Sequence, residues 1–130
     1  MMTNKPSRKI LIVDDEAHIR LLIEQTLEDL EYENVEIFTA DNGADALNTI
    51  QDLKPELVFL DVMMPNIDGY TVCRMIRRDL KMKEVYVVIL TAKGQEYDRR
   101  LSEESGANQF MTKPFNPDEL LELAKKVLFK

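Results

Sequence analysis

The sequence contains little of what would place the protein outside the ordinary globular class. One cysteine, Cys73, stands among 130 residues, so no internal disulfide can form and the composition suits a reducing compartment. Tryptophan is absent, and no apolar run approaches the roughly 20 residues that a membrane span needs. The N-terminal stretch MMTNKPSRK lacks the apolar segment of a secretory signal. These absences predict a cytoplasmic protein with no membrane partner.

Positive charge is also scarce. The 17 lysines and arginines face 24 acidic residues, which gives a net charge of −7. A broad basic face that binds nucleic acid directly is therefore not expected. The acidic balance suits a cation-binding site or a basic protein partner, and plain solubility explains it equally well. The length and the 45% of hydrophobic residues predict one ordinary globular domain over residues 1–130.

Short apolar runs alternate with helical patterns from one end of the chain to the other. Strands are predicted at 10–13, 35–40, 56–60, 85–90 and 109–112, and helices at about 19–30, 43–53, 69–80, 95–105 and 116–128. Five βα units with continuously apolar strands predict an α/β fold, with a doubly wound parallel sheet covered by helices on both faces. The alternating strand 35–40 is expected at an edge of this sheet.

The predicted helices differ in the apolar face that they offer the core. The first should bury Ile19, Leu22, Ile23, Leu27 and Leu30, which recur at helical spacing. The helix at 95–105 has only Tyr97 and Leu101 to bury, so we expect it to pack weakly and to be the mobile element. Cys73 lies within the pattern of the helix 69–80 and is expected in the packed core.

Polar side chains follow four of the five predicted strands. Asp14-Asp15-Glu16 ends the first strand, Asp61 the third, Thr91 the fourth and Lys113 the fifth. Because ligands bind beyond the carboxyl ends of parallel strands, we expect these groups on one rim. Each alone has an ordinary explanation, such as a helix cap for Asp14 or Asp15 and a solvated side chain for Lys113.

Taken together, the rim residues indicate a cation site that serves phosphate chemistry. Two carboxylates 4 Å apart repel by roughly 4 kcal/mol at an effective dielectric near 20, and one lysine does not neutralise three acids. Hard oxygen ligands favour Mg²⁺, with Mn²⁺ as an alternative. Thr91 could then donate to a phosphoryl oxygen, Lys113 could balance its charge, and Asp61 is placed as a nucleophile toward phosphorus.

Four motifs at the strand ends resemble those of one family. ILIVDDE, LVFLDVMMPNIDGY, VVILTAK and FMTKPF occur in the order and with the spacing of the response-regulator receiver domain of two-component signalling. The resemblance covers about residues 8–128 and leaves 1–7 as a polar tail. It implies a flavodoxin-like (βα)5 fold with the strand order 2-1-3-4-5.

The resemblance also implies roles for the acidic residues. Asp61 would be the phospho-acceptor, which takes a phosphoryl group from a sensor histidine kinase or a histidine phosphotransfer protein. Asp14 and Asp15 would hold Mg²⁺, directly or through water, together with Asp61 and the backbone carbonyl of Met63. A carbonyl ligand does not depend on the side chain, so a methionine at position 63 is compatible with metal binding.

The same resemblance implies a switch. Thr91 would move its hydroxyl toward the phosphoryl group, and Phe110 would be the aromatic residue that swings inward with it. Lys113 would be the lysine of the site, followed by a cis bond to Pro114. Met63 and Lys93 occupy the positions at which relatives tune dephosphorylation. The phosphorylated form would then present the fourth helix, fifth strand and fifth helix to an output domain or target protein, or to a second copy in a homodimer.

Three alternatives belong to other classes. A degenerate receiver would act only as an interaction module. A phosphatase with an aspartate nucleophile would need a second acid at position 63, where this chain has methionine. A flavin-binding protein would need a phosphate loop after the first strand, where Asp14 and Asp15 would repel phosphate. We therefore expect no enzyme beyond self-phosphorylation and dephosphorylation, either as a stand-alone receiver or as part of a longer regulator.

Overall fold

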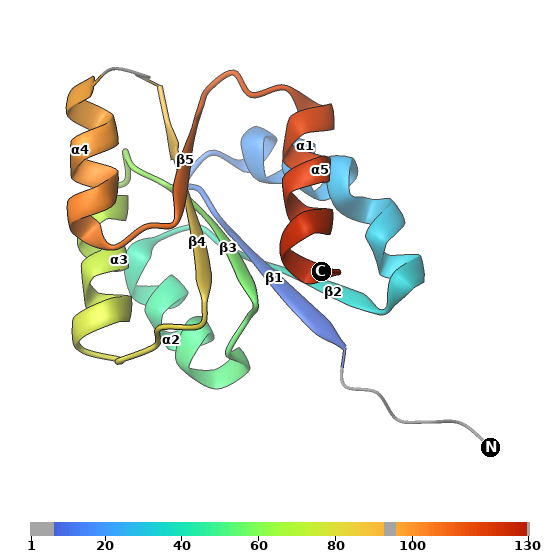
Figure 1. Ribbon diagram of the computed structural model, residues 1–130, viewed down its shortest axis with the longest axis horizontal. Helices are drawn as coiled ribbons and strands as arrows, with labels where there is room; N and C mark the ends of the chain where they lie inside the picture. The colour runs from blue at the N-terminus through green and yellow to red at the C-terminus, as the bar shows by residue number, and fades with distance from the viewer. Residues whose placement is uncertain (1–6, 93–95, 130) are drawn as a thin grey trace.

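A five-stranded parallel sheet forms the centre of the molecule, with helices on both faces (Figure 1). The computed structural model describes residues 7–92 and 96–129. The strand order is β2-β1-β3-β4-β5, which confirms the predicted fold. The strands are β1 (Arg8–Val13), β2 (Val35–Ala40), β3 (Leu57–Asp61), β4 (Tyr86–Thr91) and β5 (Gln109–Thr112). As expected from its alternating pattern, β2 lies at an edge.

The sheet separates the core into two apolar layers, which are covered by the helices. The helices are α1 (Ala17–Leu27), the 3₁₀ helix η1 (Glu28–Glu33), α2 (Gly43–Leu53), α3 (Gly69–Arg78), α4 (Glu96–Ser105) and α5 (Pro117–Leu128). One layer joins α1 and α5 to the sheet, and the other joins α2 and α3 to its opposite face. Strand residues alternate between the layers, so Leu11 lies in one and Ile12 in the other. Cys73 is buried in the second layer, as predicted.

The first helix is shorter than predicted. α1 ends at Leu27, and the chain continues as η1 until Asn34, whose φ of 64° ends the helical course. Leu30 still reaches the core from η1. The prediction for Leu22 was wrong, because its side chain is 43% exposed. The stripe that faces the sheet passes through Ile23 and Leu27, and Leu22 lies beside it.

The fourth helix differs from its prediction in a way that matters below. Tyr97 was expected to be buried, but its side chain is 67% exposed. Leu101 is only partly buried. The buried positions of α4 are instead polar: Asp98, Ser102 and Ser105. This polar inner face supports the expectation of weak apolar packing.

The parallel registers bring the ends of the strands together. Asp61 is the last residue of β3, one position further than predicted, and pairs with Leu90 of β4. Thr91 pairs with Thr112 of β5, and the next residue, Lys113, donates its backbone N–H to the Thr91 carbonyl at 2.7 Å. The acidic residues after β1 lie at the same rim, since Val13 pairs with Leu60.

Candidate functional site

Lys113 joins two carboxylates that come from different strands. Its Nζ lies 2.7 Å from Oδ1 of Asp61 and 3.0 Å from Oδ2 of Asp14. Asp14 is fully buried and Asp61 is 2% exposed, so both acids lie out of bulk water. The peptide bond between Lys113 and Pro114 is cis, as expected. The structure therefore brings together three of the residues that were predicted to form the site.

Three neighbours besides Lys113 hold the side chain and backbone of Asp14. Its Oδ1 accepts from the backbone N–H of Glu16 at 2.9 Å, and its carbonyl accepts from Nη1 of Arg20 at 2.8 Å. Its own N–H donates to the carbonyl of Ala40 at 3.2 Å. The N-cap of α1 is Glu16, so the alternative in which Asp14 or Asp15 serves merely as a helix cap was wrong.

Asp61 carries an unusual protonation equilibrium. Burial raises its pKa from 3.8 to about 6, and the negative charges of Asp14 and Asp15 add to this effect, while Lys113 opposes it. An ion pair alone would lower the pKa of an aspartate, so burial and like charge outweigh the lysine here. Burial also works against the charge of Lys113, but its two carboxylate partners more than compensate and raise its pKa. The site holds more negative than positive charge.

The acidic residues after β1 are the described group best placed to hold a cation. Ligand oxygens of Asp14, Asp15 and Glu16 lie within 4.8 Å of one another, with Asp14 buried and the other two exposed. An excess of carboxylate over ammonium and a set of hard oxygen donors fit Mg²⁺. Glu16 was not among the predicted ligands, although it directly follows them in the DDE motif.

The segment after Asp61 turns tightly back into α3. Met63 is 74% exposed, so it lies largely in solvent, and Asn66 adopts a φ of 72°. Asp68 caps α3 by accepting from the N–H of Thr71 at 2.8 Å. At Gly69 an added Cβ would lie 2.2 Å from the carbonyl oxygen of Asp61. Glycine is therefore required where α3 begins, because the helix lies directly against the backbone of the site.

The two predicted switch residues lie on neighbouring strands. Thr91 is buried at the end of β4. Phe110 pairs with Ile89 and is partly buried against the α2–α3 layer of the core. Lys93, which was expected beside the site, lies outside the described residues. Within the part of the chain that the structure describes, no helix has both the length and the apolar character to cross a membrane.

Comparison with known proteins identifies the family. Residues 10–125 match the model of the response regulator receiver domain. The chain is 41% identical over 122 residues to the alkaline phosphatase synthesis transcriptional regulatory protein PhoP of Bacillus subtilis, covering 94% of this chain and 49% of that protein. It is 42% identical over 121 residues to the phosphate regulon transcriptional regulatory protein PhoB of Pseudomonas aeruginosa, covering 93% and 52%.

Solved structures of response-regulator proteins also match this chain. The chemotaxis protein CheY4 of Vibrio cholerae matches with a TM-score of 0.83 and 30% identity, covering 94% of this chain and 99% of that one. The receiver domain of NtrX from Brucella abortus matches with a TM-score of 0.79 and 35% identity, covering 92% and 97%. The chain belongs to the response-regulator receiver family of two-component signalling. It spans about half the length of the curated relatives it matches.

Proposed function

We propose that Asp61 is the phospho-acceptor of this receiver domain and takes a phosphoryl group from a sensor histidine kinase or a histidine phosphotransfer protein. The observation that carries the proposal is the position of Lys113 Nζ, which lies 2.7 Å from Asp61 Oδ1 and 3.0 Å from Asp14 Oδ2. With a pKa of about 6, the Asp61 carboxylate is mainly ionised at neutral pH. It is then available as a nucleophile with an ammonium beside the incoming phosphate.

Asp14, Asp15, Asp61 and the carbonyl of Met63 would hold the metal, Mg²⁺ or alternatively Mn²⁺, with Glu16 as a further candidate. The bound ion would supply charge neutralisation for the transferred phosphoryl group. Lys113 orients the Asp61 oxygen and would balance one equatorial oxygen of that group. We propose that Thr91, buried at the neighbouring strand end, donates its hydroxyl to another phosphoryl oxygen, and that Phe110 repacks with it.

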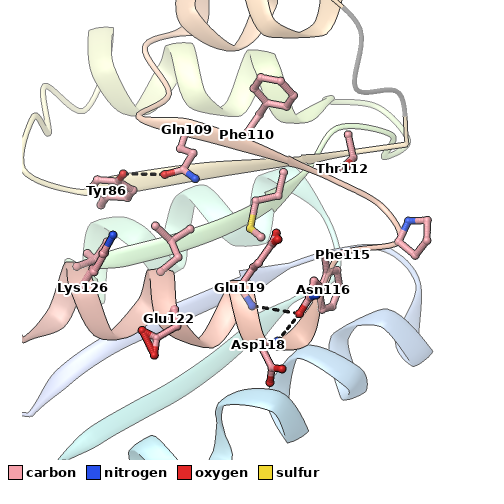
Figure 2. Close-up of a pocket in the computed structure, with 14 residues that line it drawn as sticks. Tyr86, Gln109, Phe110, Thr112, Phe115, Asn116, Asp118, Glu119, Glu122 and Lys126 are labelled. Atoms are coloured by element: carbon pink, nitrogen blue, oxygen red, sulfur yellow. Dashed lines mark hydrogen bonds between the residues drawn. The ribbon is translucent and has the colours of Figure 1, made fainter.

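Output would pass through the surface made by α4, β5 and α5. An open groove lies between β5 and α5 (Figure 2), and Asp14, Asp15 and Asp61 are not among the residues that line it. Its wall is apolar at Met111, Phe115 and Leu123 and acidic at Glu119 and Glu122. We propose that this surface binds a downstream target protein, an output domain or a second copy of the chain after phosphorylation, and that the receiver works in the cytoplasm. The names of the relatives describe transcriptional regulators, which supports an output domain in a longer protein.

The experiment that tests the acceptor is direct. A small phosphodonor with Mg²⁺ should add the mass of one phosphoryl group to the wild type and none to Asp61→Asn. Asp52→Asn, which changes an exposed aspartate on α2, should gain phosphate like the wild type. Equal labelling of Asp61→Asn would show that another residue accepts the group. Failure of the wild type to gain phosphate would favour the degenerate receiver.

The phosphatase alternative has little support. Position 63, where such an enzyme needs an acid to protonate the leaving group, holds the exposed side chain of Met63. Steady turnover of an external phosphomonoester would revive this alternative. We propose that catalysis is limited to the phosphorylation and dephosphorylation of Asp61 itself.

A further inference from the structure

The inner face of α4 is held to the protein by polar groups. Asp98 is 6% exposed and Ser102 is 2% exposed, and both face the body of the protein. One of their atoms, Asp98 Oδ2, is buried without a hydrogen-bond partner in the described part of the chain. Burying a polar atom without a partner opposes folding. The polar inner face therefore holds α4 to the protein less strongly than an apolar face of the same size would.

One side chain from α3 reaches this polar face. Tyr70 is buried, and its hydroxyl donates to Asp98 Oδ1 at 3.3 Å and approaches the Asp98 carbonyl at 3.5 Å. Burial, reinforced by the charge of Asp98 and partly offset by the neighbouring Ser102, raises the pKa of Tyr70 to about 12, so the hydroxyl remains a donor at neutral pH. Both distances exceed the usual 2.5–3.0 Å of O–H···O hydrogen bonds, so this contact is weak and breaks easily.

The C-terminal end of α4 is attached in another way. Arg77 of α3 donates from Nε to the carbonyl of Gly106 at 2.9 Å and from Nη2 to Oδ1 of Asn108 at 2.8 Å. Asn108 Oδ1 also accepts from the N–H of Val87 in β4 at 2.8 Å. The two bonds that Arg77 donates are short and come from a permanently charged guanidinium. Asp98 lies in the first turn of α4, so the weak contact is at the end that follows Thr91, and the strong one is at the far end.

Tyr70 is also adjacent in sequence to the backbone of the acceptor. The preceding residue, Gly69, donates its N–H to the carbonyl of Val62 at 3.0 Å, and a Cβ on it would lie 2.2 Å from the Asp61 carbonyl oxygen. The first turn of α3 therefore cannot stay in place if the Asp61–Val62 backbone moves toward it. Any such displacement reaches Tyr70 one residue later.

We propose that Tyr70 is a positioning residue that latches the N-terminal turn of α4 to the first turn of α3 through Asp98, and so couples α4 to the acceptor segment. The latch is a property of the unmodified chain. The coupling rests on the proposed phosphorylation of Asp61. A purely structural Tyr70 would act through its ring, and removal of the hydroxyl alone would then leave α4 unchanged.

The first test removes only the hydroxyl. In Tyr70→Phe we expect the amides of residues 100–105 to exchange about three- to tenfold faster in unphosphorylated protein, the change expected when one hydrogen bond of ordinary strength is lost. Amides in β1 and β3 should exchange as in the wild type. The matched control is Tyr97→Phe, which removes an exposed hydroxyl from α4 itself. If Tyr70→Phe exchanges no faster in α4 than this control, the latch is overturned.

A double-mutant cycle tests the identity of the partner. Asp98→Ala should also speed exchange in α4, and the two changes together should do little more than either alone, because both remove the same contact. Asp98→Asn keeps an acceptor oxygen and should lie closer to the wild type than Asp98→Ala does. Additive effects of Tyr70→Phe and Asp98→Ala would show that Tyr70 does not act through Asp98.

The coupling is tested on protein treated with a small phosphodonor and Mg²⁺, with phosphate content measured by mass. Phosphorylation should speed α4 exchange in the wild type and add little in Tyr70→Phe, in which the latch is already open. If phosphate is attached but α4 responds equally in both proteins, the coupling is wrong and the proposed function stands. If no phosphate is attached, the proposed function and the coupling fail, while the result on the unmodified latch stands.

Discussion

The ammonium of Lys113 lies 2.7 Å from Oδ1 of Asp61. The lysine side chain is 16% exposed and the aspartate side chain 3%, so the two charges meet largely out of water. Because a buried charge is costly without its partner, the pair makes the stability of the domain depend on the chemistry of its site. The same holds for Asp14, since its Oδ2 binds the ammonium of Lys113 at 3.0 Å and would also lose its partner without it.

Removal of the ammonium should destabilise the metal-free protein. In Lys113→Met the aliphatic stem remains, but Asp14 and Asp61 lose their common cation, and we expect the free energy of unfolding at pH 8 to fall by about 3 kcal/mol. The loss should shrink at pH 5, where Asp61 takes up a proton. Urea unfolding at both pH values measures it. Lys125→Met, at an exposed position of α5, is the control and should cost little; equal stability of the two variants would contradict the role of Lys113.

Neutralising Asp61 should have the opposite effect. Its pKa is raised from 3.8 to about 6 on folding, so the folded protein binds the proton more tightly than the unfolded chain. Stability therefore falls as the pH rises from about 4 to about 6, and the loss persists above pH 6. Asp61→Asn should be more stable than the wild type at pH 8 by on the order of 2–3 kcal/mol, and the difference should vanish near pH 4.

This comparison must be made in EDTA, because a bound cation would stabilise the Asp61 carboxylate. Asp52→Asn, which neutralises an exposed acid, should track the wild type at every pH. A variant Asp61→Asn that loses stability at pH 8 would mean that Lys113 outweighs burial and the charge of Asp14. The measured sign therefore decides which of the two effects is larger at this site.

The strand-end cluster could be predicted because it depends on topology alone. Continuous apolar strands imply a parallel sheet, and a parallel sheet places Asp14, Asp61, Thr91 and Lys113 at one rim whatever the details of packing. The helical periodicity did not determine which apolar residues of a helix are buried. In α1 both Leu22 and Ile23 fit an apolar stripe, and only the contact with the sheet shows that Leu22 is exposed.

The polar contacts of α3 and α4 could not be predicted, because their residues resemble a solvated surface in the sequence. Asp98 and Ser102 are residue types that are usually exposed, yet both are buried here. Arg77 likewise fits an ordinary last helical turn, while its guanidinium binds carbonyl and amide oxygens from two loops. Their roles follow from the approach of two helices, which local periodicity does not encode.

Magnesium should stabilise the folded state through the acidic residues after β1. A cation that binds only the folded protein at ten times its dissociation constant adds about 1.4 kcal/mol to the free energy of unfolding. We expect Mg²⁺ to raise the urea midpoint of the wild type and EDTA to reverse the effect. Asp15→Asn should lose most of this increment, because Asp15 belongs to the three-carboxylate group and is exposed to incoming cations. Glu31→Gln, which removes an exposed acid from η1, should retain it.

The contact between α3 and the acceptor backbone predicts a strong effect of one methyl group. In Gly69→Ala the new Cβ would lie 2.2 Å from the Asp61 carbonyl oxygen and 2.9 Å from its carbonyl carbon. Backbone atoms cannot turn aside as a side chain does, so either α3 or the end of β3 must shift. We expect a loss of stability of about 2–3 kcal/mol, the upper part of the range for overpacking, and slower phosphorylation of Asp61. Urea unfolding and the rate of mass gain with a small phosphodonor measure the two effects.

The matched control is Ala44→Ser, which adds one atom at an exposed position of α2 and should change neither the stability nor the rate of phosphorylation. Wild-type stability with slowed phosphorylation would mean that the backbone yields locally, so that Gly69 sets the geometry of the acceptor and contributes little to stability.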